Sequence, residues 1–584
     1  MSVDGGAIIG KTLADQGVKY LFTLCGGHIS PILVGAKAEG IKVVDVRDEV
    51  SSVFAADAVG RMTGVPGVAA VTAGPGVTNT ITAVKNAEMA QTPLVIFGGA
   101  TATILRGRGS LQDIDQMTLM KPLCKWVARV TTVAALRPTV EKAFEIAMSG
   151  VPGPVFIEVP IDLLYPESVV KKWYLTEAGL DDPKGLGPKA MALFLKGHLA
   201  KQFHAPHVDL SLPTPDLKIP FLDDEQSKLD SVAAEVAKAE RPVLVVGAQA
   251  LVNLDPSQAE ALAESVNHLG IPTYLAGTAR GLLGRFNGIQ FRHARKAALK
   301  AADLVIIAGF PFDFRLGYGR IIPKRATLIA ANLSKTDLRK NRRPDIGLNM
   351  HPGEFLNRLA VLADGKRPSW EPWFEQMKER EDARDAEIIE QASESSELVN
   401  PLKFFTALEE KMTDDAVLVV DGGDFVATAA YILRPRAPLS WLDPGVFGTL
   451  GVGGGFALGA ALCRPKTEVW LIWGDGSSAY SLAEFDTYVR HGLAPIAVIG
   501  TDASWAQIAR DQVEILGDSI GTELLRTDYH KVAEGYGGVG LLLDDESKID
   551  AVLDEAKALS ASGKPVVINV HIGGSDFRKG SISV

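Results

Sequence analysis

Two aspartates near the carboxyl end of the chain are spaced as oxygen ligands of a metal ion would be. Asp475 lies in a Gly-Asp-Gly turn directly after one apolar run, and Asp502 follows a second apolar run, from Ala494 to Gly500. Carboxylate oxygens suit Mg²⁺ or Ca²⁺, and Mg²⁺ with few protein ligands normally shares its shell with phosphates. The pair therefore predicts a site for Mg²⁺ or Ca²⁺, and Mg²⁺ there would share its shell with a phosphorylated ligand. The alternative is a plain turn at Asp475 and a helix cap at Asp502.

The elements that must position these aspartates are two parallel strands. The run from Glu468 to Trp473 is rich in β-type residues, and an apolar and acidic helix is expected from Ser481 to about His491. Strands joined by one helix lie parallel, so both following loops reach the carboxyl edge of the sheet, where ligands of open α/β sheets bind. Gly474 and Gly476 allow other groups to approach the Asp475 backbone closely.

This stretch resembles the metal and diphosphate motif of thiamine-diphosphate-dependent enzymes of the acetolactate synthase-like group. In that family the first aspartate, the second residue of a later pair and a carbonyl two positions on bind Mg²⁺. The resemblance gives these roles to Asp475, Asp502 and Ser504. The chain has Thr501 and Asp502 where the family usually has Asn-Asn, which keeps the oxygen ligand and adds a negative charge. The further cofactor contacts that the resemblance implies here are Gly474, Gly476, Ser477 and Trp505.

Two glycine-rich turns in the same part of the chain extend the resemblance. The strand from Val417 to Val420 runs into a Gly-Gly turn, and the N–H groups of the helix that follows should face the diphosphate. Asp424 stands here where relatives often have a neutral polar residue. In a later turn, Leu450 takes the place of the wedge that bends the cofactor, although a glycine-rich helix packing on a sheet would look similar. The implied contacts are Gly423, Asp424, Phe425, Gly448 and Leu450.

Glu49 opens a predicted helix in the amino-terminal block. A first-turn acid favoured by the helix dipole is the commoner role of such a residue. In the family, a glutamate at this place bonds N1′ of the aminopyrimidine, so the resemblance gives Glu49 an acid-base role. We expect its side chain to be buried. The turn from Ala73 to Asn79 resembles the pyrimidine-side loop and implies contacts from Gly74 and Asn79.

Two further residues of this block are candidates for contact with the substrate. His28 follows a predicted strand in Cys-Gly-Gly-His and is either a proton shuttle or polarising donor, or an ordinary surface histidine. Gln112 lies in Leu-Gln-Asp, where relatives carry Phe-Gln-Glu with the glutamine facing the reactive carbon. The resemblance therefore makes Gln112 a substrate contact, in a pocket whose wall differs at Leu111.

The whole chain reads as α/β, with three doubly wound parallel-sheet domains, because 584 residues exceed one core and helix and strand patterns alternate. We expect a pyrimidine-binding domain at 1–170, a connector at 171–222, a central nucleotide-binding-like domain at 223–365, a charged linker helix at 366–398 and a diphosphate-binding domain at 399–584. By resemblance the central domain binds ADP or CoA, ahead of FAD. Its candidate phosphate partners are Arg280, Arg315, Arg320 and Arg339.

Composition excludes several other classes of protein. With 47% apolar and 22% charged residues the chain is globular, and a net charge of -10 without a long basic stretch argues against nucleic-acid binding. Three widely separated cysteines lack metal-site spacing and suit a reducing compartment. No apolar run approaches the roughly 20 residues of a membrane span. We therefore expect a cytoplasmic protein with no membrane segment in this chain.

Four motifs in the family's order imply a catalyst. In this family the cofactor lies between the first domain of one subunit and the third of another, which implies a homodimer or homotetramer. Several segments resemble the 2-hydroxyacyl-CoA lyase branch, among them Leu24 to Pro31 and Thr527 to Lys531. That branch implies a small-molecule acyl-CoA substrate, cleaved reversibly to an aldehyde or ketone plus formyl-CoA. The alternatives are an acetolactate synthase-like carboligase or decarboxylase of 2-oxo acids, and a non-catalytic family member.

Overall fold

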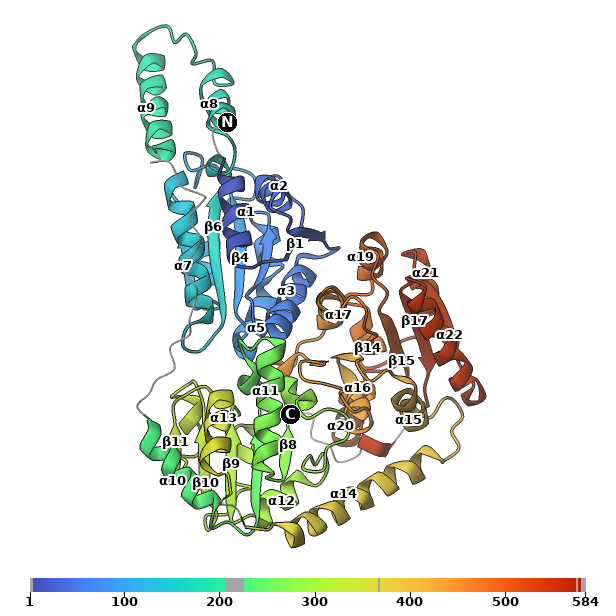
Figure 1. Ribbon diagram of the computed structural model, residues 1–584. Coiled ribbons are helices and arrows are strands. Elements are labelled where there is room, and N and C mark those ends of the chain that lie inside the picture. Colours follow the sequence, from blue (N-terminus) through green and yellow to red (C-terminus); the bar gives the residue numbers. More distant parts are fainter. Residues whose placement is uncertain (1–3, 205–224, 366–367, 574–575, 579–584) are drawn as a thin grey trace. The chain divides into compact units, whose positions relative to one another are not determined.

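The computed structural model describes residues 4–204, 225–365, 368–573 and 576–578 (Figure 1). It divides into two units, Met1–Gly60 with Val65–Ile219, and Arg61–Gly64 with Pro220–Val584, and each is described by itself. The first unit contains one parallel sheet and the second contains two, all flanked by helices. The predicted fold class, three doubly wound parallel-sheet domains, is confirmed. The exact domain boundaries stay predictions, and positions 205–222 of the predicted connector lie outside the described residues.

The sheet of the first unit has the strand order β2-β1-β3-β4-β6-β5. Its strands are β1 Tyr20–Leu24, β2 Lys42–Asp45, β3 Gly67–Val71, β4 Leu94–Ala100, β5 Trp126–Arg129 and β6 Pro154–Pro160. The helices are α1 Gly5–Asp15, α2 Ser30–Ala38, α3 Glu49–Thr63, α4 Pro75–Thr78, α5 Ile81–Ala90, α6 Gln116–Met120 and α7 Leu136–Met148. Because helices cover both faces, β3 is buried along its whole length and shows no polar alternation.

A short helical strap follows β6, within the segment predicted as a connector. It consists of α8 Glu167–Lys171, a π-helical turn at Lys172–Thr176 and α9 Leu186–Phe203. Fully buried Asp162 fastens this strap to the end of the sheet. Its carboxylate accepts hydrogen bonds from the Thr103 backbone and hydroxyl, from the Tyr174 hydroxyl at 2.6 Å and from Gln202 Nε2 at 2.6 Å. One carboxylate thus joins the loop after β4, the π-turn and α9.

The central sheet of the second unit has the order β11-β10-β9-β7-β8. Its strands are β7 Pro242–Val246, β8 Thr273–Leu275, β9 Leu304–Ala308, β10 Thr327–Ala331 and β11 Ile346–Leu348, and its helices are α10 Gln226–Val236, α11 Pro256–Leu269, α12 Arg295–Ala301 and α13 Pro352–Leu362. The predicted charged helix is α14 Glu371–Ala392. The Trp370 and Trp373 indoles fix its start by donating to the carbonyls of Ala239 and Pro242 at 2.8 and 3.0 Å.

The third sheet has the order β13-β12-β14-β15-β17-β16. Its strands are β12 Val417–Asp421, β13 Trp441–Leu442, β14 Val469–Gly474, β15 Ile496–Thr501, β16 Val539–Leu543 and β17 Val566–His571. Its helices are α15 Pro401–Lys411, α16 Gly423–Ile432, α17 Val452–Cys463, α18 Asp475–Ser478, α19 Glu484–His491, α20 Ala506–Leu516, α21 Tyr529–Gly535 and α22 Ile549–Ala561. The strands on either side of the predicted acid pair, β14 and β15, are parallel neighbours, as the sequence indicated.

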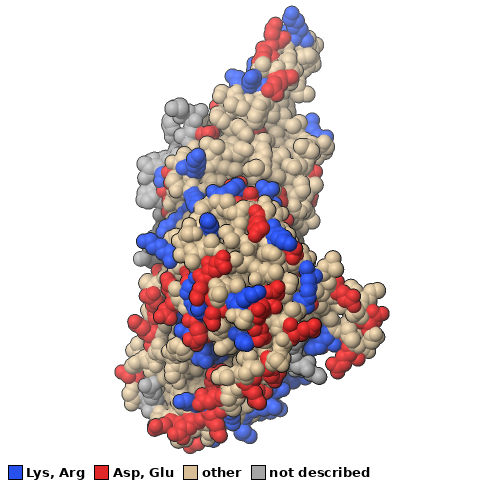
Figure 2. Space-filling model, turned by 90° about the vertical axis from the view of Figure 1, so that its right-hand side faces the viewer, with Lys and Arg blue, Asp and Glu red and all other residues tan. Residues whose placement is uncertain are grey.

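Positive and negative side chains are interspersed on the face shown in Figure 2, and among its described residues no continuous basic surface appears. No helix within the described ranges combines the length and apolar character that crossing a membrane requires.

Replacing Asp162 by Asn should destabilise the first unit by about 3 kcal/mol, because the amide N–H groups would face donors that now bond a carboxylate. Hydrogen exchange followed by mass spectrometry should show faster exchange in α9 than in the wild type. Asp181→Asn is the matched control, because exposed Asp181 accepts one hydrogen bond, from Thr176. Unchanged protection of α9 in Asp162→Asn would contradict the anchoring role.

Candidate functional site

Glu49 and the turn after β3 lie together in the first unit. The Glu49 side chain is buried, and its Oε2 accepts a hydrogen bond from Asn79 Nδ2 at 3.0 Å. A Cβ added to Gly76 would lie 3.6 Å from Glu49 Oε1, so the turn leaves that oxygen accessible only to a closely fitting group. The predicted burial of Glu49 is confirmed. Since Asn79 occupies one carboxylate oxygen, the other is available to a ligand.

His28 faces the same edge of the sheet from the loop after β1. Its Nδ1 is 3.1 Å from the Thr72 hydroxyl, and a Cβ on Gly99 would meet the His28 Cβ at 2.5 Å. The ring is partly buried, and this desolvation lowers the pKa of His28 below its usual 6.5. It is therefore neutral at pH 7, with Nε2 as the ring nitrogen not engaged by Thr72.

The loop that carries Gln112 packs directly on the turn after β3. Gly74 has φ of 62°, and a Cβ there would lie 2.9 Å from the Gln112 carbonyl, which explains the glycine. Buried Gln116 braces this contact, because its Oε1 accepts from the Gly74 N–H at 3.3 Å and its Nε2 donates to the Gly99 carbonyl at 2.8 Å. No sequence motif singles out Gln116.

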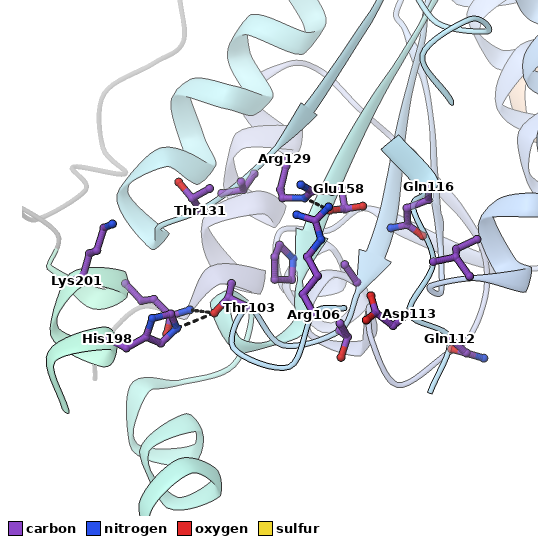
Figure 3. Close-up of a pocket in the computed structure, with 16 residues that line it drawn as sticks. Thr103, Arg106, Gln112, Asp113, Gln116, Arg129, Thr131, Glu158, His198 and Lys201 are labelled. Carbon is purple, nitrogen blue, oxygen red and sulfur yellow. Dashed lines mark hydrogen bonds and ion pairs between the residues drawn. The ribbon is translucent and has the colours of Figure 1, made fainter. Parts of the chain in front are cut away.

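A cavity of about 340 Å³ lies beside this loop, at the carboxyl ends of β4, β5 and β6 (Figure 3). Gln112 and Gln116 line it together with Arg106 from the same loop and His198 from α9. Figure 3 shows His198 hydrogen-bonded to Thr103 and Arg129 paired with Glu158. The cavity is at the small end of the range for ligand sites. Sequence reasoning missed it because α9, which closes one side, fell in the predicted connector.

Asp475 and Asp502 approach each other in the second unit, as predicted. Asp475 accepts from the N–H groups of Gly476 at 2.7 Å and Ala503 at 2.8 Å, and Asp502 accepts from the Ser504 N–H at 3.0 Å. Desolvation raises the pKa of Asp475. Desolvation, followed by the charge of Asp475, raises the pKa of Asp502 to about 7. The charge of Arg526 lowers the pKa of both carboxylates, but it does not outweigh their burial.

A buried carboxylate supports the turns around this pair. Asp421, at the end of β12, is fully buried and accepts from the N–H groups of Gly451 and Gly453 and from the Trp473 indole. Burial raises its pKa to about 7. The Leu450 side chain lies against Gly422, where an added Cβ would meet it at 2.4 Å. Asp421 thus fixes the turn that contains Leu450 relative to β14.

The helix that follows, α16, begins at two glycines with positive φ, Gly422 at 74° and Gly423 at 90°. Ser477 closes the adjacent turn by donating to the carbonyls of Asp421 at 2.6 Å and Gly474 at 3.0 Å. The Phe425 ring packs on Gly500 and on two phenylalanines of α15, so only its backbone faces the turn. The Asp424 side chain is held by Arg510 of α20, a partner that no sequence motif indicated.

Comparison with known protein families matches three regions of this chain. Residues 3–119 match the N-terminal TPP binding domain of thiamine pyrophosphate enzymes, residues 229–359 match their central domain, and residues 421–570 match their C-terminal TPP binding domain. Similarity to curated relatives extends over almost the full length. A protein named 2-hydroxyacyl-CoA lyase 2 from Danio rerio is 49% identical over 99% of this chain and 93% of the relative.

The chain belongs to the thiamine pyrophosphate enzymes. The protein named 2-hydroxyacyl-CoA lyase 2 from Homo sapiens is 45% identical over 99% of this chain and 92% of the relative. A probable acetolactate synthase from Mycobacterium bovis is more distant, at 33% identity over 97% of this chain and 96% of the relative. Thiamine pyrophosphate is another name for thiamine diphosphate. The family that matches is therefore the one that the sequence motifs resemble.

The residues present fit this cofactor. Within the described ranges no three His, Cys, Asp or Glu side chains are arranged around a common metal position. Two carboxylates and a carbonyl, however, leave coordination positions of Mg²⁺ open to diphosphate oxygens. The mutual repulsion of Asp475 and Asp502 is what a bound cation would relieve, and the glycines at the start of α16 leave its N–H groups open to an anion.

Replacing Gly476 by Ala should displace the Trp505 ring, because a Cβ there would lie 2.4 Å from it. We expect a shift in tryptophan fluorescence that is absent when the same change is made in a Trp505→Phe background. Gly535→Ala is the matched control, since a Cβ at Gly535 meets no atom within 4 Å. Identical spectra for Gly476→Ala and the wild type would show that the turn adjusts without moving Trp505.

Proposed function

We propose that this protein is a thiamine-diphosphate-dependent lyase that cleaves a 2-hydroxyacyl-CoA to an aldehyde or ketone and formyl-CoA. The observation that supports it most is the 45–49% identity, over nearly the whole chain, to several relatives named 2-hydroxyacyl-CoA lyase 2. The acetolactate synthases that match are more distant, at 33% identity. The reverse reaction would condense formyl-CoA with a carbonyl compound.

Glu49 is the proposed acid-base group of the cofactor's pyrimidine. When bound, thiamine diphosphate supplies a nucleophilic carbon and a sink for the electron pair released as the carbon-carbon bond next to the thioester breaks. Glu49 Oε2 is held by Asn79, which orients the carboxyl and leaves Oε1 to share a proton with N1′ of the pyrimidine. The low exposure of Glu49 excludes water from this proton.

His28 is the proposed base for the 2-hydroxyl group of the substrate. With Nδ1–H donating to Thr72, the lone pair of the neutral ring lies on Nε2 and can take the hydroxyl proton as the carbonyl product forms. Gln112 is the proposed substrate contact beside it. The cavity next to Gln112 has room for part of the group attached to the substrate's hydroxyl-bearing carbon.

We propose that Mg²⁺ and the diphosphate group of the cofactor bind to the second unit. Asp475, Asp502 and the Ser504 carbonyl would hold Mg²⁺, and the N–H groups after Gly422 and Gly423 would hold the diphosphate. Gly474, Gly476, Ser477 and Trp505 form the turns around that position, with the Gly448 carbonyl and Leu450 on the side of the cofactor rings. Since Ser477 and Phe425 use their side chains within the protein, we assign them backbone contacts only.

A homodimer or homotetramer is proposed, with the cofactor between the first unit of one subunit and the second unit of another. Helix α20 supports an interface next to the metal position. None of its residues is buried, and Ile508, Val513, Ile515 and Leu516 expose large apolar side chains. Such a cluster of apolar side chains is typical of a surface that a partner covers.

The nucleotide part of CoA, or ADP, is proposed to bind a cleft of about 470 Å³ in the second unit, in preference to FAD. Of the predicted phosphate partners, Arg280 lines the cleft but stacks on Trp441 and donates to the Ala430 carbonyl, and Arg315 is paired with Asp313. Arg315, Arg320 and Arg339 are absent from the cleft's lining. Arg295 and Arg384 line it together with Tyr274 and Tyr431, which suits a phosphorylated aromatic ligand.

The reaction is tested by incubating the protein with thiamine diphosphate, Mg²⁺ and either a 2-hydroxyacyl-CoA or pyruvate, and identifying products by mass spectrometry. We expect formyl-CoA and an aldehyde from the first tube and no acetolactate from the second. Glu49→Gln should lower turnover about 100-fold or more, because the amide cannot share the proton. Glu39→Gln, on the exposed end of α2, is the control. Acetolactate as the only product would favour the 2-oxo acid carboligase instead.

Arg384→Gln should weaken binding of ADP or CoA about tenfold, because one charge-assisted hydrogen bond to phosphate is lost. Isothermal titration calorimetry without thiamine diphosphate measures this separately from catalysis. Arg358→Gln, on α13 and paired with Glu354, is the matched control. Equal affinities in both variants and the wild type would place the nucleotide elsewhere.

A further inference from the structure

Asp424 places a negative charge at the start of α16. It lies in the first turn of the helix whose N-terminal N–H groups face the proposed diphosphate position. A carboxylate there is favoured by the helix dipole but repels a bound diphosphate, which needs the same positive end.

Arg510 of α20 forms an ion pair with Asp424. Its Nη1 donates to Asp424 Oδ2 at 2.6 Å and its Nη2 to Oδ1 at 3.3 Å, a two-point contact that uses both carboxylate oxygens. The two side chains are only 19% and 17% exposed. A pair this well shielded interacts more strongly than an ordinary surface pair.

The Arg510 guanidinium has one more N–H group that can donate a hydrogen bond. Arg510 Nε is buried and has no hydrogen-bond partner among the described residues, and the nearest other acidic oxygen paired with it, Asp511 Oδ1, is 4.0 Å away. A buried N–H group without a partner is costly, and a further hydrogen-bond acceptor would relieve it. Arg510 thus supplies positive charge where the sequence alone placed only the negative charge of Asp424.

We propose that Arg510 is a positioning residue for the diphosphate of the cofactor, which neutralises Asp424 so that the start of α16 accepts an anion. The proposal rests on the proposed site of the diphosphate. It also explains how the chain tolerates an aspartate where the resemblance expects a neutral polar residue. Arg510 and Asp424 therefore act as a pair. Loss of Arg510 should weaken cofactor binding, whereas loss of the Asp424 charge should not.

The opposite signs distinguish this role from a merely structural ion pair. Arg510→Gln leaves Asp424 as an uncompensated negative charge beside the diphosphate and should weaken binding of thiamine diphosphate about tenfold or more. Asp424→Asn removes the repulsion and frees Arg510, so affinity should be equal to or tighter than that of the wild type. The double variant should recover most of the affinity lost in Arg510→Gln. A structural pair would instead give similar losses in both single variants and no recovery.

The test is a double-mutant cycle measured by binding, not by turnover. The dissociation constant of thiamine diphosphate at fixed, saturating Mg²⁺ is determined by isothermal titration calorimetry for the wild type, both single variants and the double variant. Lys403→Gln, which breaks the exposed Lys403–Glu546 pair of the same sheet domain, is the control and should bind as the wild type does. Circular dichroism establishes that each variant is folded.

The outcomes separate this inference from the proposed function. Unchanged affinity in Arg510→Gln, or equal weakening in both single variants, would overturn the role of Arg510 while leaving the lyase reaction intact. The expected pattern of affinities without formyl-CoA production by the wild type would overturn the proposed reaction alone. Weaker binding in Arg510→Gln together with recovery in the double variant supports the proposal whichever substrate the enzyme uses.

Discussion

The right-handed crossover between parallel strands is the constraint on which the rest of this structure depends. In each sheet the chain first adds a strand on one side of an inner strand, and the next strand of the sequence then lies on the other side of that inner strand. The loops that follow these two adjacent strands therefore run in opposite directions. The strands are β1 and β3 in the first sheet, β7 and β9 in the central sheet, and β12 and β14 in the third. The opening between such loops is where each sheet can admit a ligand.

The three openings are filled by different chemistry. Between β1 and β3 the loops bring His28 to Thr72, and between β12 and β14 they bring the glycines before α16 to the turn at Asp475. Between β7 and β9 the backbones themselves meet, since a Cβ on Gly247 would lie 2.3 Å from the Gly309 carbonyl. The same topology therefore gives three different contacts at these points, a histidine beside a hydroxyl, a close approach of two backbones and a glycine turn beside a carboxylate.

Sequence reasoning located the elements well where local pattern and tertiary burial agree. The buried strands and the Gly-Asp-Gly turn are of this kind, because both faces of each sheet are covered and the turn must follow a strand. The predicted helix from Ser481 begins instead at Glu484, after the short α18 that Asp475 opens. Boundaries of this kind depend on hydrogen bonds between distant segments, which no local pattern records.

The hydrogen-bond and ion-pair partners of the site residues could not be predicted from the sequence. Gln116 and Arg510 have no motif, and Asp421 belonged to the glycine turn without a role of its own. Each matters through a contact with a residue far along the chain. The resemblance correctly gave the family but treated Asp424 as an isolated substitution. The structure presents it as half of a pair, because α20 returns across the start of α16.

The partner of His28 has a consequence for its proposed role as a base. A hydroxyl group, unlike a carboxylate, gives an imidazolium no counter-charge, so Thr72 does not favour the protonated ring. Any proton that reaches His28 is therefore held weakly. In the proposed role, the ring would pass the proton on to solvent or to the departing product and would not store it.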